Sequence, residues 1–178
     1  MKIKTQTRTE QILTVMHILA WVAFIGFLIQ AGVFLLSYTM TWFNPDAAKN
    51  VYRGLNLYSL SQSNFRHYTL SMAFLIALAI MKACVSFLFI KVLSKVNLVN
   101  PFKIEVSIML ERISYVLFAT WVLAMLHNAH TGWLLRKTGA MQGDWVTGEF
   151  IFIAAIVFVI SQIFKRGVEI QSENELTV

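Results

Sequence analysis

The sequence predicts an all-α protein, a four-helix transmembrane bundle with both termini in the cytoplasm. Four apolar stretches occupy most of the 178 residues, at about 12–38, 68–90, 113–135 and 145–164. Hydrophobic residues make up 57% of the chain and charged residues 13%, whereas an ordinary soluble domain carries about 25% charged residues. Lys and Arg are concentrated on one side of the four stretches, which is the pattern of the positive-inside rule.

The length of the four stretches indicates how many domains the chain contains. Each of the first three exceeds the roughly 20 residues that a helix needs to cross about 30 Å of hydrocarbon, and the fourth reaches that length only if its ends are counted. Little chain remains for a separate soluble domain, so residues 1–178 are expected to form a single transmembrane domain. The first stretch follows basic residues and ends without a small-residue cleavage site, which indicates an uncleaved signal anchor.

The basic residues are divided unevenly between the two sides of the predicted bundle. Nine lie in the two terminal tails and the connection after the second stretch: Lys2, Lys4, Arg8, Lys91, Lys95, Lys103, Arg112, Lys165 and Arg166. Five lie on the opposite side: Lys49, Arg53, Arg66, Arg136 and Lys137. Because cytoplasmic loops carry the excess of Lys and Arg, both termini are expected in the cytoplasm. The basic residues behind the net charge of +6 are thus distributed according to the membrane topology. No direct contact with nucleic acid is expected.

The segments between the stretches differ in character. The outer loop, 44–67, is rich in apolar residues, so we expect it to fold back as a lid with one short helix, either packed on the bundle or forming a ligand site. In the cytoplasmic connection, 91–112, Pro101 interrupts the helix and starts the next one. Residues 103–112 are amphipathic and suit the membrane interface. A short outer turn precedes the fourth stretch, and a polar tail, 165–178, follows it.

Lys82 lies about midway along the second stretch, where an ammonium costs roughly 2.5–3.5 kcal/mol on insertion scales. It therefore needs a partner or water. The candidate partners are polar side chains of the first and fourth stretches: Gln30, Gln162, Ser161, and Glu149 near the outer end of the fourth. Three interpretations stay open, which are an ion or proton site, a structural bridge that fixes helix register, and snorkelling towards the cytoplasmic surface.

The histidines form a second candidate site. His67, His127 and His130 are all expected near the outer surface, where three imidazoles could bind zinc or copper, but interfacial hydrogen bonding is the favoured explanation. Haem is disfavoured because His17 lies near the inner end of the first stretch, too far away to share one iron with the others. The single cysteine, Cys84, provides neither a disulfide nor a thiolate cluster. No catalytic signature is present, so we expect no enzymatic activity and no cofactor.

Three segments resemble a known family. These are Pro101-Phe102, the ending Phe164-Lys165-Arg166-Gly167 with the acidic residues and Leu176-Thr177-Val178 after it, and the loop from Asn44-Pro45 to Leu57. They resemble the domain of unknown function 2975, a family of bacterial membrane proteins. The resemblance implies four spans and no established activity, and it transfers no catalytic residue. It also implies that a small helix-turn-helix regulator of the Cro/C1 type is often encoded beside the gene.

The implied neighbour and the topology favour a non-enzymatic sensor or regulatory partner in the bacterial cytoplasmic membrane, which docks a DNA-binding regulator. The candidate docking residues are those of the tail: Lys165, Arg166, Gly167, Glu169, Glu173, Glu175 and Leu176. Alternatively, the tail is disordered and its basic residues only anchor the span to lipid. A small transporter or ion-pathway subunit that uses Lys82 is the runner-up, and metal or haem binding is third. Membrane lipids are expected partners, and a homo-oligomer stays open.

Overall fold

The computed structural model describes residues 8–51, 55–96, 102–138 and 149–175, and it is 93% helical with no strand among those residues. The elements are α1 (Arg8–Phe43), the 3-10 helix η1 (Pro45–Lys49), α2 (Tyr58–Ser63), α3 (Phe65–Lys95), α4 (Ile104–Thr138) and α5 (Glu149–Glu175). The predicted all-α class is therefore confirmed. By length and composition, α1, α3, α4 and α5 are each able to cross a membrane.

The helix bounds differ from the predicted ones mainly at the fourth stretch. Helices α1, α3 and α4 contain the first three stretches, and α4 is continuous from Ile104, so the amphipathic entry belongs to the same helix. Helix α5 begins at Glu149 and runs to Glu175, which makes most of the predicted tail helical. Several residues used in the predictions lie outside the described part of the chain: Lys2, Lys4, Arg53, Pro101, Trp145, Leu176 and the outer turn near 139–144.

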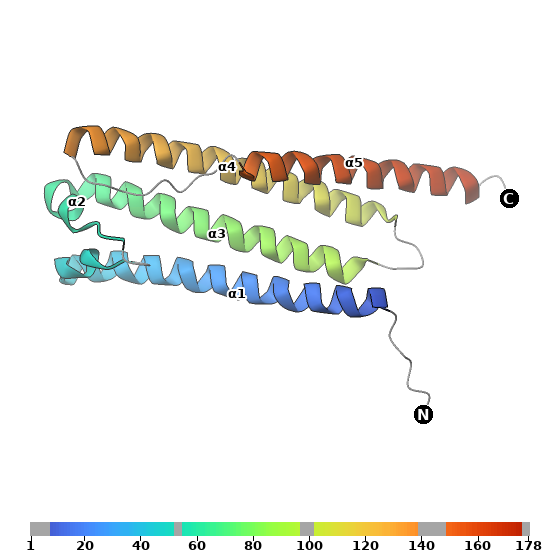
Figure 1. The fold of residues 1–178 in the computed structure, drawn as a ribbon, viewed down its shortest axis with the longest axis horizontal. Coiled ribbons are helices and arrows are strands. Elements are labelled where there is room, and N and C mark those ends of the chain that lie inside the picture. The colour runs from blue at the N-terminus through green and yellow to red at the C-terminus, as the bar shows by residue number, and fades with distance from the viewer. Residues whose placement is uncertain (1–7, 52–54, 97–101, 139–148, 176–178) are drawn as a thin grey trace, which may run out of the picture.

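The four long helices lie in a row in chain order. Helix α1 packs on α3, α3 on α4, and α4 on α5, whereas the backbones of α1 and α5 do not meet in the described residues. Figure 1 shows the same order, with α3 between α1 and the α4–α5 pair. One end of the bundle carries η1 and α2 and is called the η1 end. At the other, the terminal end, α1 begins, α3 passes to α4, and α5 ends.

The segment at the η1 end is ordered by caps and hydrogen bonds. The side chain of Asn44 accepts a hydrogen bond from the amide of Asp46 (3.0 Å) at the start of η1, and that of Asn64 accepts one from the amide of His67 (3.3 Å) at the start of α3. Asparagine at such positions satisfies amides that have no partner within the helix. The Leu57 amide donates to the Ala48 carbonyl (2.8 Å) and so ties α2 to η1.

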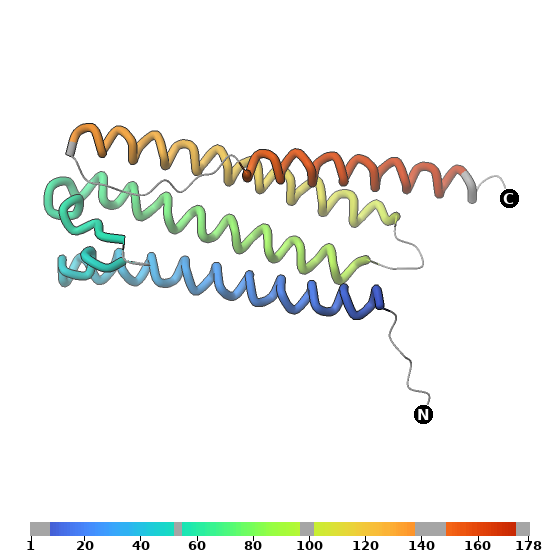
Figure 2. The backbone as a smooth tube through the Cα atoms, viewed as in Figure 1, coloured from blue at the N-terminus to red at the C-terminus, as the bar shows by residue number. Residues whose placement is uncertain are grey.

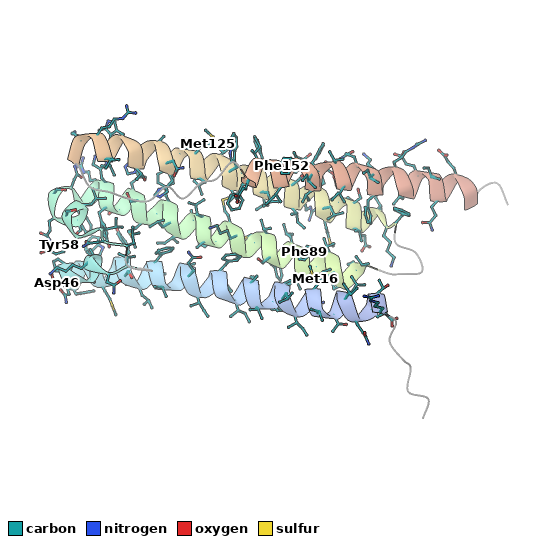
Figure 3. The ribbon with its side chains drawn as sticks, in the orientation of Figure 1. Met16, Asp46, Tyr58, Phe89, Met125 and Phe152 are labelled. Carbon is teal, nitrogen blue, oxygen red and sulfur yellow. The ribbon has the colours of Figure 1, made fainter. Side chains whose placement is uncertain are left out.

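One lysine strengthens this end further. The Lys49 ammonium lies 2.8 Å from the carboxylate of Asp46 and 4.7 Å from the centre of the Tyr58 ring on α2. The hydrogen bond to Asp46 raises the pKa of Lys49. Asp46 and Tyr58 are labelled together at the η1 end in Figure 3. Residues 44–51 and 55–67 are thus a folded part of the bundle with two short helices.

The buried apolar residues form two clusters, one towards each end. The first joins α1, η1, α2, α3 and the last turns of α4 around Phe34, Leu57 and Met72. The second joins α3, α4 and α5 around Val92, Ile113 and Ala154. On α3 the first cluster extends to Ala79, and the second includes Val85 as a packed neighbour. Lys82 therefore lies at the junction between the two clusters.

The outer faces of the row are apolar and exposed, as lipid contact requires. Met125 on α4 and Phe152 on α5, both labelled in Figure 3, are 50% and 67% exposed. Phe43, where α1 ends at the η1 end, is 92% exposed. Exposed apolar area on this scale is unusual for a water-soluble monomer, and a hydrocarbon environment explains it.

Candidate functional site

At the terminal end, a motif of the predicted cytoplasmic connection contacts a motif of the predicted tail. The ring of Phe102 lies against Gly167 of α5, and its centre is 5.4 Å from that of the Phe164 ring. A Cβ atom added at Gly167 would come within 2.8 Å of the Phe102 ring. Glycine is therefore the residue that lets this ring approach the helix backbone.

This contact forms one wall of an apolar groove of about 510 Å³. The other residues along it share one face of α5, since they follow the spacing of a helix. They are Ile163, Arg166, Gly167, Ile170 and Gln171. Figure 2 shows α5 projecting past the start of α4 at this end, so this face of α5 has no long helix packed against it beyond Phe102 in the described part of the chain.

Two exposed ion pairs lie at the terminal end, and Arg166 of the second also lines the groove. Lys95 at the end of α3 meets Glu105 at the start of α4, with 3.2 Å between the ammonium and the carboxylate oxygen. Arg166 meets Glu169 one turn later on α5, at 2.7 Å. Exposed pairs of this kind contribute little to stability, about 0–1 kcal/mol each. They do give the terminal end a surface of mixed charge, with both signs available to a partner.

Among the predicted tail residues, the structure places Lys165 to Glu175 on one continuous helix, and Leu176 lies outside the described residues. Arg166 and Gly167 line the groove. Glu169 and Glu173 are exposed. The alternative of a disordered tail does not apply to residues 165–175, which continue α5.

Lys82, the second candidate site, lies half-buried in the middle of α3. It lines a cavity of about 300 Å³ together with side chains from all four long helices: Phe27, Val85, Ser86, Leu117, Thr120 and Phe150. A smaller void of about 10 Å³ lies next to it and reaches Gln30. The ammonium is 5.8 Å from the centre of the Phe150 ring, a contact that suits a cation facing an aromatic π-system.

Of the candidate partners of Lys82, the structure brings one polar side chain to the same void, that of Gln30. Ser161 and Gln162 lie elsewhere. Ser107 of α4 donates a hydrogen bond to the Ser161 carbonyl (2.9 Å), and the Gln162 amide donates to the Ser161 hydroxyl (3.3 Å). Lys82 forms no ion pair with any described residue, Glu149 included.

The depth of Glu149 follows from where α5 begins. Glu149 was predicted near the outer end of the fourth stretch and is the first residue of α5, which begins beside the middle of α4 (Figure 1). The contacts of the two helices agree, because Ser107 of α4 is hydrogen-bonded to Ser161 of α5, and Thr120 and Phe150 line the same cavity. Glu149, which precedes Phe150, is therefore at the level of Lys82. The part of α4 nearest the η1 end extends beyond the start of α5.

The third candidate site, the histidines, is partly assembled at the η1 end. His67 Nδ1 and His130 Nε2 are 3.3 Å apart, and His127 lies beside Phe74 with 5.5 Å between ring centres. His127 is 1% exposed, and neither of its ring nitrogens has a hydrogen-bond partner. Within the described ranges, no three His, Cys, Asp or Glu side chains have an arrangement suited to a metal ion. His17 is half-buried and lies near the start of α1, at the opposite end of the bundle.

Comparison with known proteins identifies the family but not an activity. A family model described as "Protein of unknown function (DUF2975)" matches residues 57–178, which is more than half of the chain. The chain belongs to the DUF2975 family. No curated protein and no solved structure matches it. The resemblance drawn from the sequence is thus confirmed for Pro101-Phe102 and the closing segment, while the loop before Leu57 lies outside the matched residues.

The DUF2975 match covers α2 to α5 and therefore includes both walls of the groove and Lys82. Helix α1, which supplies Gln30 and Phe27, precedes the match. The sequence singles out both the Pro-Phe and the Lys-Arg-Gly motifs, but it did not predict that they contact each other. The available signal was a glycine within a helix-forming segment, placed on the same side of the membrane as an isolated aromatic residue.

Proposed function

We propose that this protein is a non-enzymatic regulatory protein of the bacterial cytoplasmic membrane, and that its terminal end holds a small helix-turn-helix DNA-binding protein. The observation that carries the proposal is the groove between Phe102 and α5. Its walls come from two of the motifs on which the family resemblance rests, both of which are predicted to be cytoplasmic. An open apolar groove beside charged side chains is a common way to receive a helix from a partner.

The chemistry of the groove suits a basic, partly apolar partner surface. Ile163, Ile170 and Phe102 offer apolar contact. Glu169 and Glu173 on the same helix offer carboxylates that can pair with basic side chains of a DNA-binding protein at the contact itself. Such a protein held at the membrane is withdrawn from its DNA sites, so its availability changes without any enzymatic step.

The test uses the full-length protein with a tag at its N-terminus, purified in mild detergent from membranes of its own host. The expected result is a co-purifying helix-turn-helix protein in stoichiometric amount, identified by mass spectrometry. We expect the substitution Ile170→Glu to reduce the retained partner by about tenfold or more, because it places a charge in the apolar groove. Ser172→Glu is the matched control, since it adds the same charge about 200° further around α5.

Two results would contradict the proposal. One is recovery of the wild-type protein without a DNA-binding partner. The other is a partner that Ile170→Glu and Ser172→Glu retain equally, because binding would then not involve the groove.

A small transporter or ion-pathway subunit remains a second candidate, favoured by Lys82 and Gln30 at one void in the middle of the bundle. Its test is the substitution Lys82→Met in cells. If transport and growth are unchanged while the protein is present at its normal level, this candidate loses its central residue. Metal binding at His67, His127 and His130 stays a prediction, and metal analysis of the purified protein checks it.

A further inference from the structure

The cavity beside Lys82 has the size and the walls of a ligand site. Its volume of about 300 Å³ is at the lower end of the range for small-molecule sites, roughly 300–1,000 Å³. Aromatic and aliphatic side chains form most of the wall, notably Phe27, Leu117 and Phe150. An apolar chain fits such a wall better than a hydrated solute does.

The polar groups of the cavity wall favour an anionic ligand. Lys82 is the sole ionisable side chain among the described residues that line the cavity and the void next to it. The hydroxyl of Ser86 donates to the Lys82 carbonyl (3.1 Å), and that of Thr120 donates to the Val116 carbonyl (2.7 Å). Both hydroxyl protons are thus committed to the helix backbone. The ammonium remains as the group that can bind an anion.

The route into the cavity lies between two helices that do not pack on each other. Phe27 belongs to α1 and Phe150 to α5, and no backbone contact joins these helices. The floor between them is made by α3 and α4. Lys82 lies about midway along α3, which is long and apolar enough to cross a membrane, so the cavity would lie at the depth of the hydrocarbon in a bilayer that α3 spans.

We propose that this cavity binds a long-chain carboxylic acid, which enters from the lipid between α1 and α5 and pairs its carboxylate with Lys82. A buried ammonium is unfavourable without a counter-ion, and one carboxylate neutralises one lysine. The acid reaches this depth because its protonated form is soluble in hydrocarbon. A phospholipid is disfavoured, since its anionic headgroup stays at the interface whereas Lys82 lies about midway along α3. The inference is independent of the regulator at the terminal end.

The experiment measures binding of cis-parinaric acid, a naturally fluorescent long-chain carboxylic acid, to the purified full-length protein in phosphatidylcholine nanodiscs. Saturable binding is expected, with displacement by hexadecanoic acid. Hexadecan-1-ol, which has the same chain without the charge, should displace the probe at least about tenfold less well. Phosphatidylglycerol in the nanodisc should not compete at the same mole fraction.

The variants distinguish the site from partition into lipid. Lys82→Met should weaken binding by about tenfold or more, whereas Lys82→Arg should stay within about threefold of the wild type. Lys91→Met is the matched control, because Lys91 is on the same helix, faces Phe87 at 4.5 Å and does not line the cavity. Val85→Phe keeps the charge but fills the cavity and should also abolish binding.

Three results would overturn the proposal. The first is equal binding by Lys82→Met and the wild type, since binding would then not depend on the ammonium. The second is equal displacement by hexadecanoic acid and hexadecan-1-ol. The third is equal competition by phosphatidylglycerol, which would assign the site to a lipid headgroup instead of a free acid. Size-exclusion profiles of the variants establish that each is folded.

Discussion

Gly167 and Gly132 are both glycines within long helices, but their surroundings differ. A Cβ atom at Gly167 would meet the Phe102 ring, whereas one at Gly132 would have nothing within 4 Å. Glycine in a helix costs about 1 kcal/mol relative to alanine, so Gly132→Ala is expected to leave stability unchanged or raise it by up to that amount. Gly167→Ala should instead lower the free energy of unfolding by about 1–2 kcal/mol, because the ring must move.

Thermal or denaturant unfolding of the two variants in the same detergent checks this prediction. The double variant Phe102→Ala with Gly167→Ala should lose less stability than the sum of the single variants, since the ring that causes the clash is absent. Additive losses would show that Phe102 and Gly167 are not in contact.

Lys82 is expected to destabilise the folded protein when no ligand is bound. Replacement of Lys82 by Met keeps an unbranched side chain and removes the charge, so the free energy of unfolding should rise by about 1–3 kcal/mol. Unfolding in detergent without added fatty acid measures the change. Lys82→Arg, which keeps the charge, should show no such gain. A loss of stability in Lys82→Met would mean that the ammonium makes a favourable contact in the ligand-free protein.

At the scale of single residues, the sequence identified candidate site residues but not the side chains that they contact. Hydropathy alone identified Lys82 as a charge in the middle of a span, and its need for a partner followed from the cost of burial. The choice between Gln30 and Gln162 required the axial position of each helix, which hydropathy does not specify. The contact of Phe102 with Gly167 was missed for the same reason.

At the scale of the elements, the register of α4 and α5 gives a sharp prediction. On a Cys84→Ala background, the pair Ser107→Cys and Ser161→Cys should form a disulfide readily, because the Ser107 hydroxyl lies 2.9 Å from the Ser161 carbonyl. The pair Thr131→Cys and Phe150→Cys should not, since Phe150 and Thr120 line the same cavity, and the 11 residues of helix from Thr120 to Thr131 span about 16 Å. Mobility shifts of the oxidised protein in membranes measure both.

The second pair discriminates between two arrangements. Had α5 spanned the full bundle from Trp145 to Phe164 opposite α4, Phe150 would lie near Thr131. Efficient oxidation of that pair would therefore restore the predicted span and contradict the position of α5 seen in Figure 1. Length and hydropathy establish that a helix is able to cross a bilayer, but not its shift along a neighbouring helix.

The C-terminal part of α5 shows where the sequence misled. A polar, acidic segment after an apolar stretch was read as a tail, yet residues 165–175 contain good helix formers and no proline. The Arg166–Glu169 pair, three residues apart, supports this helix by a few tenths of a kcal/mol. A change from apolar to polar composition marks the membrane boundary, and it does not by itself end a helix.

At the scale of the whole molecule, the row of helices explains why two kinds of site coexist. Only neighbouring helices pack by backbone contact in the described residues, so each end of the row keeps an open side. The Lys82 cavity lies between α1 and α5, which have no backbone contact with each other. At the terminal end the projecting part of α5 exposes a groove. A closed bundle of the same four helices would bury both.

The distribution of basic residues predicts the orientation of the molecule in the membrane. Seven basic residues of the described chain lie at or near the terminal end, Arg8, Lys91, Lys95, Lys103, Arg112, Lys165 and Arg166, and four lie towards the η1 end, Lys49, Arg66, Arg136 and Lys137. The positive-inside rule therefore places the terminal end in the cytoplasm. On a Cys84→Ala background, a membrane-impermeant maleimide should label Lys49→Cys in intact spheroplasts, and Ser172→Cys only in inverted vesicles. The opposite pattern would place the groove outside the cell, where no DNA-binding protein is available to occupy it.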